Sequence, residues 1–252
     1  MIESKDNQLV KHINKLKHKK DRKIYKQYIV EGKKSVDEAL RFDKGNIVEI
    51  IVSEAYAKTS NIEENYIIFN DEVFNYVTEH QTPEGIMAIL KMKEEQTQID
   101  YKEPYIILIN EIQDQGNLGN IIRIADSLNL KQIILSENTV DPYMPKVVRS
   151  TMGSTFRINT FERNIINIIE ELKQNGYEIY SASIKTNSEN LYLTKFKGKK
   201  TAIIFGNEAK GVVQEILNKT KSLYIPMKGQ IDSLNVASAV AIISYEVYRQ
   251  NL

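Results

Sequence analysis

The sequence predicts an α/β protein with two domains. Its 252 residues are enough for two compact cores. Short apolar runs alternate with helix-like segments along the chain, as in α/β folds. Between them, residues 93–103 (KEEQTQIDYKE) are polar and lack helical or strand periodicity. We place a linker there and expect domains at residues 1–96 and 97–252.

The first expected element is a basic amphipathic helix over residues 8–20. Four apolar residues recur at helical spacing and leave the lysines outside: Leu9, Val10, Ile13 and Leu16. The segment from Lys11 to Lys26 holds eight Lys or Arg residues and one acid, although the net charge of the chain is only +1. Such a run is often a solvated helix face, but its density beside Tyr25 and Tyr28 favours RNA as a partner. We expect RNA contacts from five side chains: Lys15, Lys19, Lys20, Arg22 and Lys23.

The rest of the N-terminal domain is expected to alternate strands and helices. Residues 28–32 (YIVEG) predict a short strand, and Ser35 is the expected N-cap of the helix that follows. Residues 47–53 (IVEIIVS) are rich in β-branched side chains, which predicts a second strand. The remaining expected elements are a strand at 65–69, a helix around 71–80 and a strand at 85–92.

The C-terminal domain is expected to hold a mostly parallel sheet. Its short apolar runs are separated by helical segments and lie at residues 105–110, 132–136, 177–183, 201–206 and 222–227. Strands that are apolar almost throughout are buried on both faces, which is typical of parallel sheets covered by helices.

Composition excludes several kinds of chemistry. The chain has no cysteine and only three histidines, so disulfides, thiol nucleophiles and thiolate-bound zinc are ruled out, and we expect no metal site. No run of about 18 uninterrupted apolar residues occurs, and charges stand where a signal peptide needs apolar residues. We therefore expect a cytoplasmic protein without a membrane partner.

Polar residues and glycines stand directly after three of the apolar strands, where open α/β sheets bind ligands. After the first, a helix opens with Asn117, Gly119, Asn120 and Arg123. Backbone N–H groups and a guanidinium can meet an anionic or polar group there, but a glycine turn with an exposed arginine explains the segment equally well. No GxGxxG or GxxxxGK[ST] motif occurs, which argues against a dinucleotide-dependent dehydrogenase and against a nucleoside triphosphate.

The second segment contains Gly206, which permits close approach of the backbone to a ligand or simply ends the strand. The third has a loop with Gly229 and Asp232, followed by Ser233 and Asn235 before a helix of small residues. Such a helix packs tightly against another backbone. A polar SLN before it is also typical of a cofactor-lined helix N-terminus, with Ser233 as a candidate N-cap.

Together the three segments resemble the SpoU/TrmH family of the SPOUT superfamily. The family's first motif is matched by Asn117, Gly119, Asn120, Ile121 and Arg123. The second is matched by Gly206, Glu208 and Gly211, and the third by residues 225–227, Gly229 and residues 233–237. The likeness spans residues 103–252, and the one departure, Ile124 in place of a small polar residue, is not expected to reduce activity. The N-terminal part resembles, on weaker cues, an L30e/L7Ae-like substrate-binding domain.

The resemblance implies a homodimeric RNA 2'-O-ribose methyltransferase that uses S-adenosylmethionine. It implies a C-terminal SPOUT domain with a parallel sheet and a deep trefoil knot, an exception to the rule that chains avoid knots. The implied cofactor contacts are Ser183, Ile184, Gly206, Ile225, Met227, Leu234 and Asn235. The implied catalytic residues are Asn117, Arg123, Glu208, Ser233 and Asn235.

The resemblance makes Arg123 the central catalytic residue. Because guanidinium deprotonates only above about pH 12, we favour stabilisation of a developing alkoxide over a general-base role. The favoured substrate is 23S rRNA, since the substrate-binding domain precedes the catalytic one. The alternatives are a tRNA 2'-O-methyltransferase and a non-catalytic RNA-binding or ribosome-assembly factor of the same fold. The complete set of implied catalytic residues argues against the non-catalytic alternative.

Overall fold

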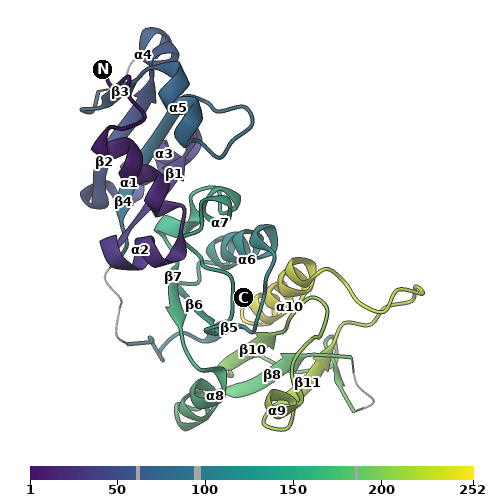
Figure 1. Cartoon of the computed structure of the whole chain (residues 1–252). Helices are drawn as coiled ribbons and strands as arrows, with labels where there is room; N and C mark the ends of the chain where they lie inside the picture. The colour runs from purple at the N-terminus through teal and green to yellow at the C-terminus, as the bar shows by residue number, and fades with distance from the viewer. Residues whose placement is uncertain (61–62, 94–97, 185–186) are drawn as a thin grey trace. The chain divides into compact units, whose positions relative to one another are not determined.

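The structure, a computed structural model, describes residues 1–60, 63–93, 98–184 and 187–252 (Figure 1). The chain divides into two compact units, Met1–Glu94 with Asp141–Phe156, and Glu95–Val140 with Arg157–Leu252. The expected boundary between residues 96 and 97 lies outside the described residues. The segment Asp141–Phe156, which the expected division assigns to the second domain, belongs to the first unit. No helix within the described ranges is long and apolar enough to cross a lipid bilayer.

The first unit is built on a mixed four-stranded sheet in the order β1-β4-β2-β3. Its strands are β1 (Gln27–Glu31), β2 (Ile47–Ser53), β3 (Ile67–Phe69) and β4 (Ile86–Lys91). Its helices are α1 (Gln8–Leu16), α2 (Lys19–Tyr25), α3 (Lys33–Phe42), α4 (Glu54–Thr59), α5 (Asp71–Val77) and α7 (Pro145–Ser150), with 3-10 turns at Lys44–Asn46 and Ser154–Phe156. The expected strands and helices are present, but α3 begins two residues before Ser35. Gly32, rather than Ser35, is its N-cap.

Both faces of this sheet are buried. Side chains of a strand point alternately to opposite faces, so Ile29 enters one core with residues of α1 and α5, whereas Val30 enters another with residues of α3. Val148 of α7 and Phe156 belong to this second core. The segment Asp141–Phe156 therefore completes the hydrophobic core of the first unit.

The expected basic helix is divided in two, and Arg22 explains the division. Arg22 is only 1% exposed, and its Nη1 donates to the carbonyls of Leu16 and Lys17, each at 2.8 Å. These carbonyls lie at the end of α1, where helix carbonyls lack intrahelical partners. Arg22 Nε and Nη2 donate to Asp141 Oδ2 at 3.0 and 2.6 Å. The structure thus contradicts the expected RNA contact of Arg22, because its guanidinium is buried and bonded to Leu16, Lys17 and Asp141.

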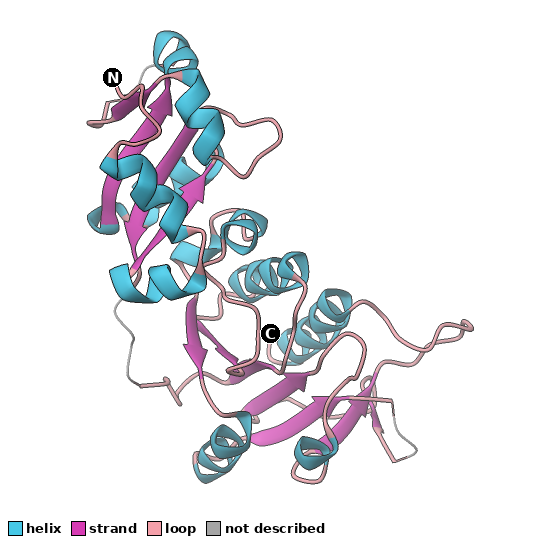
Figure 2. Cartoon of the chain, in the orientation of Figure 1, coloured by secondary structure: helices cyan, strands magenta, loops and turns pink. Residues whose placement is uncertain are grey.

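The second unit contains a seven-stranded sheet in the order β7-β6-β5-β10-β8-β11-β9, and all its pairs are parallel. Its strands are β5 (Tyr105–Ile109), β6 (Gln132–Leu135), β7 (Asn159–Glu162), β8 (Glu178–Ala182), β9 (Glu189–Asn190), β10 (Thr201–Phe205) and β11 (Lys221–Tyr224). Helices α8 (Ile165–Gln174) and α9 (Gln214–Leu217) cover one face, and α6 (Gln115–Ser127) and α10 (Val236–Gln250) cover the other (Figure 2). The prediction of a parallel sheet covered on both faces is confirmed.

Candidate functional site

The candidate site lies at the carboxyl ends of β5 and β10. From β5 the chain continues through β6 to β7 at one edge, whereas β10 and β8 lie on the other side of β5. The strand order therefore reverses between β5 and β10, and open α/β sheets bind ligands where this happens. The first motif follows β5 and the second follows β10.

The loop after β10 folds back tightly on itself. Gly211 N donates to Asn207 O at 2.8 Å, and Asn207 Oδ1 accepts from the N–H groups of Ala209 and Lys210 at 2.9 and 3.1 Å. A Cβ on Gly206 would lie 2.3 Å from the backbone carbon of Gly211. Glycine is thus required at position 206 by the close approach of two backbone segments.

We expect Gly206→Ala to weaken cofactor binding strongly. The new methyl group would meet backbone atoms, so the loop from Asn207 to Gly211 must move, and with it one wall of the pocket. Titration calorimetry with S-adenosylmethionine should show a loss of more than about tenfold in affinity, because a small displacement of positioning groups is costly. Gly45→Ala is the control, since no atom lies within 4 Å of its Cβ position. Unchanged affinity in Gly206→Ala would contradict this account of the loop.

The three motifs meet in one hydrogen-bonded chain of side chains. Asn235 Nδ2 donates to Asn117 Oδ1 at 3.0 Å, and Asn117 Nδ2 donates to Glu208 Oε1 at 3.1 Å. Glu208 also accepts from the N–H groups of Gln113 and Asp114, at 3.4 and 3.3 Å. Three of the five implied catalytic residues are therefore brought together.

At the start of α6 the sequence left two interpretations open, a site for an anionic or polar ligand and an ordinary glycine turn. Carboxylates of the chain accept from two backbone N–H groups there, those of Asp114 and Asn117. Asp114 Oδ1 caps the helix by accepting from Asn117 N at 2.7 Å, and Glu208 lies beside it. At α10 the N-cap is Asn235, whose Oδ1 accepts from Ala237 N and Ser238 N at 2.9 and 3.3 Å. Ser233, the candidate N-cap, lies before the helix and does not cap it.

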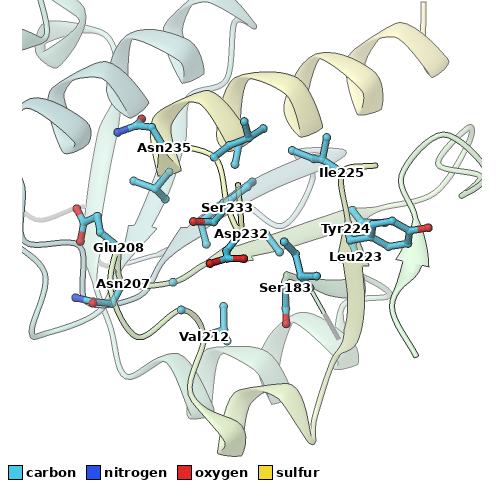
Figure 3. Close-up of a pocket in the computed structure, with 18 of the residues that line it drawn as sticks. Ser183, Asn207, Glu208, Val212, Leu223, Tyr224, Ile225, Asp232, Ser233 and Asn235 are labelled. Carbon is cyan, nitrogen blue, oxygen red and sulfur yellow. The ribbon is translucent and has the colours of Figure 1, made fainter. Parts of the chain in front are cut away.

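A pocket of about 690 Å³ lies between the loops that follow β8, β10 and β11. All seven implied cofactor contacts line it, as do Glu208 and Ser233. Figure 3 shows Asp232 and Ser233 between the loop carrying Asn207 and Glu208 on one side and Ser183 on the other. Apolar walls come from Phe205, Leu217, Leu223, Val236 and Ile243. The volume and the mixture of apolar walls with a few polar groups fit a nucleoside-sized cofactor such as S-adenosylmethionine.

Arg123 does not line this pocket. It is exposed on α6, and within the described part of the chain no hydrogen bond or ion pair engages its guanidinium. Asn117 also lies outside the lining, but it is joined to the pocket through Glu208 and Asn235. The arrangement therefore leaves one cation unpaired on the helix that carries the first motif.

The implied set omitted Asp232, an acid of the pocket. Its carboxylate lies among the lining groups in Figure 3, and no described side chain forms an ion pair with it. Lys210 also lines the pocket. The sequence signal for Asp232 was its position directly before the SLN of the third motif.

A parallel sheet whose loops after β8, β10 and β11 enclose a nucleoside-sized pocket, with amides, a carboxylate and an exposed arginine on neighbouring elements, is typical of cofactor-dependent group-transfer enzymes. Residues 104–245 match the SpoU rRNA Methylase family, and residues 7–88 match the MRM3-like substrate binding domain. The chain belongs to the SpoU rRNA Methylase family. The resemblance inferred from the three motifs is thereby confirmed.

Two similar proteins match the chain over nearly its full length. The 23S rRNA (guanosine(2553)-2'-O)-methyltransferase RlmP of Bacillus subtilis (strain 168) is 36% identical over 249 residues, 98% of each chain. The crystal structure of an AdoMet-bound rRNA methyltransferase from Sinorhizobium meliloti superposes with a TM-score of 0.85 and 28% identity, covering 100% of this chain and 98% of that one. Both units of the present chain thus have counterparts in these proteins.

Proposed function

We propose that the protein transfers a methyl group from S-adenosylmethionine to the 2'-hydroxyl of a ribose in 23S rRNA. The observation that carries this proposal is the convergence of the second and third motif loops on one pocket, to which the hydrogen-bonded chain Asn235–Asn117–Glu208 joins the first motif. The similarity to the Bacillus subtilis enzyme, whose name specifies a guanosine of 23S rRNA, supports the same RNA here.

The pocket residues hold the cofactor, which supplies an electrophilic methyl group when bound. The seven lining residues named above position it, with Gly206 admitting close backbone approach. The remaining task is to align the ribose hydroxyl and to stabilise the charge that develops as its proton leaves. Arg123, which stays cationic, stabilises this developing charge. The residues that orient the reacting groups are Asn117, Glu208, Ser233 and Asn235.

The position of Arg123 outside the pocket supports a homodimer in which each chain contributes Arg123 to the partner's site. Tyr245 and Tyr248 of α10, the helix that packs against α6, are 48% and 46% exposed. Exposed aromatic side chains are typical of protein interfaces.

We also propose that the second unit is knotted and that the first unit is L30e/L7Ae-like. In the sheet β11 lies between β8 and β9, two strands that precede it in the chain. The insertion of this later strand between two earlier ones supports a deep trefoil knot. The mixed sheet between two helical layers and the match of residues 7–88 to a substrate binding domain support the L30e/L7Ae-like assignment of the first unit.

We expect Asp232→Asn to weaken the binding of S-adenosylmethionine more than that of S-adenosylhomocysteine. The sulfonium of the first is cationic, whereas the thioether of the second is neutral, so only the first loses attraction to the carboxylate. Because Asp232 is solvent-exposed, the expected loss is about two- to fivefold. Calorimetry with both ligands measures it, and equal losses for the two would contradict an electrostatic role.

The proposed function is tested by incubating the protein with radiolabelled S-adenosylmethionine and total RNA from cells that lack it. Separation of the RNA by size then shows which RNA carries the label. Label in 23S rRNA supports the proposal, and label in tRNA retains the reaction but replaces the substrate. No label, despite measured cofactor binding, would favour the non-catalytic RNA-binding factor.

A further inference from the structure

Tyr25, the last residue of α2, presents an ordered aromatic ring on the surface. The ring is 40% exposed, and His12 contacts it edge-on, with ring centroids 4.7 Å apart and planes at 88°. His12 Nε2 lies 2.6 Å from Gln27 Oε1, which fixes the imidazole in turn. Lys15 Nζ donates to the Tyr25 hydroxyl at 3.4 Å. The ring is thus held in place from two sides while much of its surface faces solvent.

The charges around Tyr25 distinguish it from another exposed tyrosine of the same unit. Tyr76 is 51% exposed and has Lys5 Nζ 5.4 Å from its ring centroid, but Lys5 is neutralised by Glu72 at 2.6 Å. Lys15 lies 5.9 Å from the centroid of Tyr25, and no described acid forms an ion pair with it. Lys20 of α2 and Lys26 at its C-cap are also exposed, and no described acid forms an ion pair with either. Of these two tyrosine rings, that of Tyr25 therefore lies beside the positive charge that described acids do not neutralise.

We propose that Tyr25 is a stacking platform for an unpaired base of the RNA substrate. This rests on the proposed function in that the ligand is the RNA to be methylated. Aromatic side chains stack on bases of single-stranded segments, whereas the bases of a duplex already stack on each other. Lysines beside the ring hold the phosphates that flank the base. The two contacts together select a loop or bulge over continuous duplex.

The experiment measures the Kd of the full-length protein by fluorescence anisotropy for two labelled RNAs of equal length. One is a hairpin with an unpaired loop, and the other is a fully paired duplex. Tyr25→Ala should weaken hairpin binding about tenfold and duplex binding less than about twofold, because stacking on one base is lost. Tyr25→Phe keeps the ring, and Tyr76→Ala is the matched control, so both should bind as the wild type does. The salt dependence of Tyr25→Ala should be unchanged, since no phosphate contact is removed.

Two results would overturn the platform. Equal losses of affinity for hairpin and duplex would indicate that Tyr25 belongs to a general phosphate-binding surface. If Tyr25→Ala bound the hairpin with wild-type affinity, Tyr25 would form no stacking contact with the RNA. If the wild-type protein bound neither RNA, the proposed function would fail together with the platform. Selective loss of hairpin binding, with Tyr25→Phe unaffected, supports the proposal.

Discussion

Arg123→Lys is expected to lower the rate of methyl transfer by about 100-fold or more while leaving cofactor affinity nearly unchanged. Removing one preorganised group that stabilises developing negative charge typically costs 10²- to 10³-fold. Lysine keeps the charge but loses the planar fork of donors. Arg123 does not line the cofactor pocket, so its replacement should not disturb binding there. Single-turnover kinetics and calorimetry measure the two quantities, and unchanged turnover would refute the role given to Arg123.

A mixing experiment tests whether Arg123 acts across a dimer. Arg123→Ala and Gly206→Ala are each expected to be inactive alone. In a mixed dimer, one site would combine an intact pocket with an intact arginine from the partner. Re-equilibrated mixtures should therefore recover about a quarter of wild-type activity, since half of the dimers are mixed and each has one complete site. No recovery would place Arg123 in the site of its own chain.

Asp141→Ala is expected to destabilise the first unit by about 3–5 kcal/mol, because it leaves a buried guanidinium without its counter-charge. The Arg22 and Asp141 side chains are only 2% and 10% exposed, and the contact between Arg22 Nη2 and Asp141 Oδ2 is 2.6 Å long. Urea unfolding monitored by circular dichroism measures the change in the free energy of unfolding.

A surface ion pair of the same unit provides the control for Asp141→Ala. Asp37 pairs with Lys33 four residues away, and their side chains are 53% and 59% exposed. Asp37→Ala should cost only about 0.5 kcal/mol, as exposed helical pairs do. Equally small losses in the two variants would show that the Arg22 pair does not hold Asp141–Phe156 to the first unit.

Local patterns predicted most elements of the fold. The expected strand at residues 47–53 coincides with β2, because a short run rich in β-branched side chains is a local signal. The break between α1 and α2 could not be predicted in this way. It depends on Arg22, whose partner Asp141 is 119 residues away in sequence. The three-residue turn Ser154–Phe156 joins a core most of whose other members lie between Tyr28 and Leu90.

The candidate site was predicted from the motifs, but the contacts within it were not. The resemblance to the family's three motifs implied Asn117, Glu208 and Asn235, whereas their mutual hydrogen bonds join residues 91 and 118 positions apart. Which side chain caps α10 was decided by geometry, since both Ser233 and Asn235 are good capping residues. Asp232 was overlooked because a single acid in a polar loop is common on protein surfaces.

The measurement that tests the central claim most directly is alkaline hydrolysis of 23S rRNA labelled by the protein with radioactive S-adenosylmethionine. Alkali cleaves RNA through attack of the free 2'-oxygen on the neighbouring phosphate, so a methyl group on that oxygen protects one linkage. The account predicts that the label is recovered in an alkali-resistant dinucleotide, and that Arg123→Lys yields little of it. Recovery of the label in mononucleotides would place the methyl group on a base and would contradict the account.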